Sequence, residues 1–136
     1  MALLVDSSAW IEFLRETGSS IDRRLDTELA QEHADLTTTD VVVMEALAGA
    51  RDDGERDELR QTLYGCRFLM VDGPADYEQA AEIYRACRRK GETIRKMTDC
   101  LIAAVAIRHD AELLHLDADF PAIARHTPLR LAVPAP

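Results

Sequence analysis

Short apolar runs alternate with longer amphipathic stretches along the chain, and this alternation predicts its elements. Residues 2–5 form a continuous apolar run, as expected for a strand that is buried on both faces. Ser8 is expected to cap the helix that follows, and this helix should end before Gly18. The predicted strands are 2–5, 35–38, 68–71, 112–116 and 129–133, and the predicted helices are 8–17, 21–29, 40–49, 55–64, 74–89, 98–110 and 120–125.

Strands that alternate with helices predict an α/β fold, in which helices cover both faces of a central parallel sheet. We expect one domain over residues 1–136, because the chain shows no linker, repeat or low-complexity tract. In parallel sheets, ligands bind outside the carboxyl ends of the strands, where the strand order reverses. Asp6 and Asp117 each follow a predicted strand, so both are expected at that edge.

The composition is that of an ordinary globular protein, with 47% hydrophobic residues and few glycines and prolines. No apolar run is long enough to cross a membrane, and the first residues lack the basic region of a signal peptide. The three cysteines are far apart and form no C-x-x-C pair, which disfavours a zinc site and predicts reduced thiols. A cytoplasmic protein is therefore expected.

The formal net charge of −9 argues against a protein that binds nucleic acid through a general basic surface. Residues 85–96 are a local exception, with six basic residues and one acidic residue. This basic segment is consistent with a contact to a nucleic-acid substrate. It is equally consistent with a solvated helix end, since cations complement the negative end of the helix dipole.

Several acidic residues occupy places where a charge is costly. Asp6 ends an apolar strand, Glu45 lies within an apolar helix, and Asp99 opens another. Asp117 follows a strand and is joined by Asp119. No basic residue is predicted on the same faces, so the sequence favours a divalent cation over ion pairing. Mg²⁺ and Mn²⁺ prefer carboxylate oxygens, and two such ions about 4 Å apart can assist a phosphodiester displacement.

Each acid also has a plain structural interpretation. Asp6 and Asp99 could serve as helix caps, Asp117 could form a turn, and Asp119 could cap a short helix. Glu45 is the hardest to explain in this way, because a mid-helix residue cannot be a cap. The histidines show no spacing that suits a metal site, and we interpret them as structural.

The acids also stand in a familiar order. An apolar strand ending in Asp-Ser-Ser is followed by Trp10-Ile11, then by E-A-L-A-G, T-D-C-L-I-A-A-V-A and L-D-A-D-F. This ordered set resembles the PIN-domain ribonucleases, and most closely the VapC toxins of toxin–antitoxin pairs. The resemblance implies a Rossmann-like three-layer sandwich. It also implies endonucleolytic cleavage of RNA that depends on Mg²⁺, for which Mn²⁺ can substitute.

Carried over by position, the resemblance assigns catalysis to Asp6, Glu45, Asp99 and Asp117. Asp6, Asp99 and Asp117 would hold the main ion with help from Asp119, while Glu45 would orient or deprotonate the attacking water. Ser8, or less favourably Ser7, matches the hydroxyl residue after the first acid, and Thr98 matches the hydroxyl before the third. Leu116 departs from the Thr or Asn that often precedes the fourth acid, which removes a supporting hydrogen bond and no ligand.

The resemblance also implies partners. A VapB-type antitoxin is expected to hold the enzyme inactive, and a homodimer, a heterotetramer or a larger assembly is expected with it. The apolar segments Trp10–Leu14 and Leu25–Leu29 could form a groove for an antitoxin helix, or could belong to the core. The residues expected to contact the RNA backbone are Arg88, Arg89, Arg95 and Lys96.

Two other functions compete with this interpretation. A phosphatase with an Asp nucleophile would place D-x-D after the first strand, where this chain has D-S-S. A PIN-like module that binds RNA or a partner without cleavage would usually have lost acids that this chain retains. The sequence leaves open which RNA is cut and whether one or two ions take part.

Overall fold

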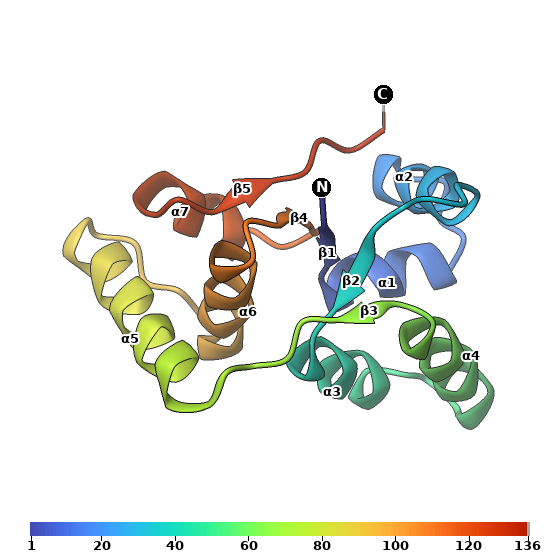
Figure 1. Cartoon of the computed structure of the whole chain (residues 1–136), viewed down its shortest axis with the longest axis horizontal. Helices are drawn as coiled ribbons and strands as arrows, with labels where there is room; N and C mark the ends of the chain where they lie inside the picture. Colours follow the sequence, from blue (N-terminus) through green and yellow to red (C-terminus); the bar gives the residue numbers. More distant parts are fainter. Residues whose placement is uncertain (136) are drawn as a thin grey trace.

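A parallel β-sheet forms the centre of the molecule, which we describe from a computed structural model of residues 1–135 (Figure 1). Its strand order is β3-β2-β1-β4-β5, and all four neighbouring pairs are parallel. The predicted parallel α/β fold is thus confirmed. The strands are β1 (Leu3–Val5), β2 (Leu36–Thr38), β3 (Arg67–Phe68), β4 (Glu112–Leu114) and β5 (Arg130–Leu131).

The first strand is the middle strand of the sheet. Leu3 of β1 is in register with Leu36 of β2 on one side and with Glu112 of β4 on the other. The chain therefore fills one half of the sheet first and then returns to fill the other half. The strand order reverses at β1, so the carboxyl ends of β1 and β4 are where a ligand site is expected.

The helices form two groups, one on each side of β1 (Figure 1). One group packs α1 against α2 and α3, and α3 against α4. The other packs α5 against α6 and both of these against α7. The helices are α1 (Ser7–Leu14), α2 (Ser20–Leu29), α3 (Asp40–Ala48), α4 (Asp53–Tyr64), α5 (Gly73–Arg89), α6 (Met97–Arg108) and α7 (Asp119–His126).

Helix α6 is buried on every side over most of its length, which explains its unbroken apolar sequence. Every residue from Cys100 to Ala106 is buried. Such a helix is enclosed by protein instead of lying on the surface. No helix within residues 1–135 is long and apolar enough to cross a membrane.

A tight turn connects α5 to α6 and sets the path of the basic segment. Gly91 has a φ of +80°, a conformation that costs glycine little and other residues more. The N–H of Glu92 donates to the carbonyl of Cys87 at 3.0 Å, which closes the end of α5. The chain then reverses, so that Arg95 and Lys96 arrive just before α6 begins.

Candidate metal centre

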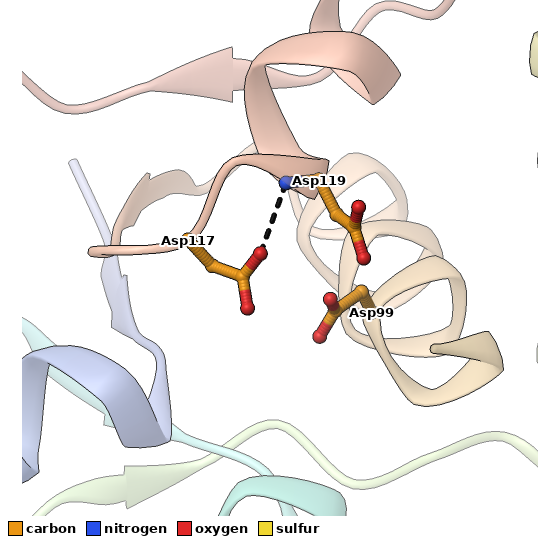
Figure 2. Close-up of side chains that lie close together, drawn as sticks. All are labelled: Asp99, Asp117 and Asp119. Carbon is orange, nitrogen blue, oxygen red and sulfur yellow. Dashed lines mark hydrogen bonds between the residues drawn. The ribbon is translucent and has the colours of Figure 1, made fainter. Parts of the chain in front are cut away.

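The acidic residues picked out in the sequence converge at the carboxyl ends of β1 and β4. Carboxylate oxygens of Asp99, Asp117 and Asp119 lie within 4.8 Å of one another, and Figure 2 shows the three side chains gathered between α6 and the start of α7. The charges of Asp6 and Asp117 both act on Glu45 and on Asp99. The structure therefore brings together side chains from the end of β1, from α3 and α6, and from the segment after β4.

Asp6 has one carboxylate oxygen in a helix cap and one directed elsewhere. Its Oδ2 accepts hydrogen bonds from the backbone N–H of Ser8 at 3.1 Å and from the Ser8 hydroxyl at 2.6 Å. The predicted cap was therefore wrong: Asp6 caps α1, and Ser8 is the second residue of that helix. Asp6 can act as the N-cap because its backbone is still extended after β1, which is the conformation that N-cap residues adopt. Its Oδ1 is buried and has no hydrogen-bond partner among residues 1–135.

Ser8 links the first acid to the segment that carries the fourth. While its hydroxyl donates to Asp6, the same oxygen accepts the backbone N–H of Leu116 at 3.0 Å. Asp117 follows directly in the chain. Of the two serines considered, the structure thus selects Ser8 as the residue that joins Asp6 to the Asp117 segment.

Glu45 is held by Thr98 across the site. The Thr98 hydroxyl donates to Glu45 Oε2 at 2.9 Å, while Oε1 is buried without a hydrogen-bond partner in the described chain. Burial raises the pKa of Glu45, the Thr98 hydrogen bond opposes this, and the Asp6 charge raises it further. Glu45 is therefore more easily protonated than an exposed glutamate.

Asp99 is the most deeply buried of the acids, with 1% of its surface exposed. Burial raises its pKa to about 8; Lys96 opposes the shift, and the charges of Asp6 and Asp117 add to it. Asp99 Oδ2 also lacks a hydrogen-bond partner within residues 1–135. An acid that is both buried and unpaired gains most from a bound cation.

Asp117 and Asp119 are positioned by backbone hydrogen bonds. The N–H of Asp119 donates to Asp117 Oδ1 at 2.9 Å, and this is the dashed line in Figure 2. The N–H of Asp117 donates to Nδ1 of His115 at 3.1 Å. Burial lowers the pKa of His115, which favours the neutral ring that can accept this bond. His115 thus orients the Asp117 segment, a contact that its position two residues earlier could have indicated.

The donor set fits a hard divalent cation. It consists of carboxylates, and three of their buried oxygens, on Asp6, Glu45 and Asp99, have no partner within the described chain. Mg²⁺ and Mn²⁺ bind oxygen ligands of this kind and keep water in their remaining positions. None of the cysteines or histidines joins the group of possible ligands found within residues 1–135.

The expectation that no basic residue would face these acids was wrong. Lys96 Nζ lies 3.3 Å from Asp117 Oδ2, and the Arg95 guanidinium lies 3.5 Å from Asp117 and 3.7 Å from Asp119. The backbone N–H of Arg95 also donates to Asp119 at 3.2 Å. The sequence suggested Arg95 and Lys96 as RNA contacts but missed their pairing with acids, because that pairing depends on the turn after α5.

The other two predicted RNA contacts lie further back along the basic segment. The Arg88 guanidinium stacks 5.6 Å from the centre of the Tyr84 ring. Arg89 lines a cavity of about 630 Å³ together with Lys90 and Arg125. Arg88 and Arg89 belong to the last turn of α5, whereas Arg95 and Lys96 lie just before α6.

The two segments predicted to form an apolar groove are divided between core and surface. Trp10 and Leu25 are fully buried, so they belong to the core. Phe13 and Leu29, in contrast, line an open cavity of about 710 Å³ with Leu36 and Cys66. This cavity contacts the starts of β2 and β3, at the opposite end of the sheet from the acids.

Carboxylates that cluster at the switch point of a parallel α/β sheet are the arrangement expected of a protein that binds a divalent metal ion through acidic side chains. A PIN-domain profile matches residues 3–126 of the chain. The chain is 46% identical over 130 residues to ribonuclease VapC11 of Mycobacterium tuberculosis. The alignment covers 96% of this chain and 97% of the relative. It is 33% identical over 116 residues to ribonuclease VapC51 of the same species, covering 83% and 82% of the two chains. The chain belongs to the PIN-domain family, in its VapC ribonuclease branch.

Solved structures agree with this fold. The VapBC2 complex of Rickettsia felis, bound to a DNA fragment from its promoter, contains a chain that matches with a TM-score of 0.76. The match covers 97% of this chain and 98% of that chain, at 18% identity. VapC20 of M. tuberculosis, a sarcin-ricin loop cleaving toxin, matches with a TM-score of 0.70 at 19% identity, covering 95% and 99%. At such identities the likeness concerns the fold.

Proposed function

We propose that this chain is the toxin of a type II toxin–antitoxin pair and acts as a divalent-metal-dependent endoribonuclease. One observation carries the proposal: buried, unpaired carboxylate oxygens meet at the switch point of the sheet in a chain 46% identical to ribonuclease VapC11. We further propose that residues 1–136 form a single PIN domain and that the protein works in the cytoplasm.

In this proposal Asp6, Asp99 and Asp117 hold Mg²⁺ directly or through water, with help from Asp119, and Mn²⁺ can take its place. The bound ion would supply Lewis-acid stabilisation of the charge that grows on the phosphate. Ser8 keeps Asp6 and the Asp117 segment at a fixed separation through its two hydrogen bonds. The ligands therefore come from separate elements that are held together before the ion arrives.

Glu45 is proposed to orient or deprotonate the attacking water. Thr98 engages Oε2, which leaves Oε1 free to accept the proton. The raised pKa of Glu45, caused first by burial, makes it a better proton acceptor near neutral pH. The water oxygen bonds to phosphorus as the bond to the 3′ oxygen breaks, and the leaving 3′ oxygen takes a proton from solvent water, giving 5′-phosphate and 3′-hydroxyl ends.

We also propose that Arg88, Arg89, Arg95 and Lys96 contact the RNA backbone, and that a VapB-type antitoxin blocks the site. The solved relatives include VapBC complexes, which supports such a partner. The net charge of −9 favours binding of a basic antitoxin segment across the acidic site. A homodimer that joins antitoxins in a heterotetramer or larger assembly completes the proposal.

The test is cleavage of total RNA by the purified, antitoxin-free protein, with Mg²⁺, with Mn²⁺ or with EDTA. We expect discrete, metal-dependent fragments from the wild type. The variants Asp6→Asn and Asp99→Asn should cut at least ~100-fold more slowly, since each removes a charged ligand. The exposed Asp26 provides the matched control, because Asp26→Asn leaves the cluster intact.

Two outcomes would overturn the proposal. If both site variants cut as fast as the wild type, the cleavage would come from a contaminating nuclease. If the wild type bound RNA tightly but cut none of it with either metal, the chain would be a binding module.

A further inference from the structure

Two cations of the chain itself lie against the acidic cluster. Lys96 contacts Asp117 at 3.3 Å, and Arg95 contacts Asp117 and Asp119 at 3.5 and 3.7 Å. Asp119 is buried and Asp117 is partly buried, with 9% and 11% of their side-chain surfaces exposed, whereas the lysine and arginine side chains are 52% and 71% exposed. The fixed acids are thus covered from the solvent side by long side chains that have room to move.

Lys96 contacts an oxygen that a bound metal ion would need. Oδ1 of Asp117 already accepts the N–H of Asp119, so Oδ2 is the freer oxygen, and Lys96 Nζ lies against it. Lys96 also acts electrostatically on Asp99 and Glu45. Its ammonium group therefore offsets the mutual repulsion of three acids at once, as a bound cation would.

The contact is of a kind that a divalent ion can displace. Half-exposed ion pairs contribute little, because water screens them and the side chains lose freedom on pairing. A doubly charged ion attracts the same carboxylates more strongly and repels the ammonium group. A displaced lysine would remain at the mouth of the site, where an incoming phosphate carries the opposite charge.

We propose that Lys96, assisted by Arg95, is a resident counter-ion of the acidic site that competes with the divalent ion for Asp117 and, once displaced, contacts the RNA phosphate. The second half of this inference rests on the proposed ribonuclease function, but the first half does not. Lys96 would lower metal affinity and raise substrate affinity, which are effects of opposite sign. A merely structural residue would not produce this combination.

The chain supplies its own control, because Lys90 is its only other lysine and lies in the same basic segment. Lys90 lines the cavity beside Arg125, and no ion pair of Lys90 is found within residues 1–135. Lys90→Met therefore removes the same charge from the segment without touching the acids. Lys96→Arg keeps a cation at the site and is the conservative variant.

The first experiment measures binding of Mn²⁺ alone, by titration with electron paramagnetic resonance of the free ion. Lys96→Met should bind Mn²⁺ about tenfold more tightly than the wild type, since it removes a unit charge within a few ångströms of the ligands. Lys90→Met and Lys96→Arg should bind close to wild type. Wild-type or weaker Mn²⁺ binding by Lys96→Met would overturn the counter-ion role.

The second experiment measures KM for an RNA oligonucleotide at saturating Mn²⁺. Lys96→Met should raise KM several-fold although it binds the metal more tightly, and Lys96→Arg should restore KM. An unchanged KM would overturn the phosphate contact. If the wild type cuts no RNA, the proposed function fails, and the Mn²⁺ titration still decides whether Lys96 is a counter-ion.

Discussion

Asp6 shows how one side chain can serve both the fold and the site. Its two carboxylate oxygens are divided: Oδ2 accepts hydrogen bonds at the start of α1, while Oδ1 is buried without a partner among the described residues. The sequence presented helix capping and metal binding as alternatives. The structure makes Asp6 a cap and leaves its second oxygen for a ligand.

Ser8 provides a test of this arrangement. Ser8→Ala removes one hydrogen bond to a carboxylate and one from the Leu116 N–H, and we expect the free energy of unfolding to fall by about 2 kcal/mol. Mn²⁺ affinity should fall as well, because the Asp117 segment loses its attachment to Asp6. Urea denaturation and Mn²⁺ titration measure the two effects.

The neighbouring Ser7 is the control for this prediction. It is half-buried at the first position of α1, and no side-chain hydrogen bond of Ser7 is found in the described chain. Ser7→Ala should therefore change neither quantity appreciably. Equal effects of the two substitutions would argue against a specific role for Ser8.

At the residue scale, the sequence could identify the acids because each interrupts an apolar element. Glu45 and Asp99 could be identified as candidate site residues from their apolar sequence surroundings alone. The pairing of Lys96 with Asp117 could not be predicted in the same way, since it depends on how the turn at Gly91 aims the following segment. The contacts of long, half-exposed side chains are not indicated by the hydrophobic periodicity of the sequence.

At the element scale, α5 and α6 are joined by an ion pair as well as by apolar packing. Arg108 of α6 donates to both oxygens of Asp76 on α5, at 3.0 and 2.8 Å. The N–H of Asp72 also donates to Asp76. Burial would raise the pKa of Asp76, but these hydrogen bonds outweigh it and lower the pKa. The charged carboxylate therefore stabilises the folded protein.

Asp76→Asn should lower the free energy of unfolding by about 2–3 kcal/mol at pH 7, because Arg108 loses a buried charged partner. The Asp76 pKa is lowered on folding, so this stabilisation is present above the ordinary aspartate pKa and is lost as the pH falls below it. The difference between variant and wild type should therefore shrink below about pH 4. Denaturation at several pH values measures it.

Asp72→Asn is the matched control, because the Asp72 side chain is exposed and makes no capping hydrogen bond. Asp72→Asn should lower the free energy of unfolding far less than Asp76→Asn does, since the Asp72 charge acts on Arg108 without a hydrogen bond. If the difference in free energy of unfolding between Asp76→Asn and the wild type were the same at pH 3 as at pH 7, packing and not the charge would be responsible for it.

The positions of the helices and strands could be predicted to within a few residues, and the ends of the strands were predicted least accurately. The strand expected over 112–116 ends at Leu114, since the chain then turns so that His115 can accept the Asp117 N–H. The expected strand 68–71 is seen as Arg67–Phe68, although the Leu69 N–H still donates to Thr38. Apolar character continues past the point where ladder pairing stops, so composition overestimates strand length.

At the scale of the whole molecule, the proposed metal site predicts that the stability of the fold depends on a divalent ion. An ion that binds only the folded state stabilises it, by about 2.7 kcal/mol at a concentration 100-fold above its Kd. For a chain of this size, Tm should rise by roughly 8 °C when Mg²⁺ replaces EDTA at that concentration. Differential scanning fluorimetry measures the shift.

The same measurement separates the ligands from other acids. Asp99→Asn should abolish most of the shift and keep the Tm in EDTA close to wild type, because Asp99 is buried and its raised pKa favours the neutral form. Asp26→Asn should keep the full shift. A shift that survived in Asp99→Asn would place the ion elsewhere.

The position of β1 in the sheet has a consequence for how the protein is made. Leu3 pairs with Glu112, so the middle of the sheet stays half-formed until the ribosome has synthesised β4. Asp6 emerges long before Asp117 and Asp119, which follow β4 in the chain. A nascent chain that has not reached Asp117 therefore carries no assembled site, and we expect it to be inert toward the RNA that surrounds it during translation.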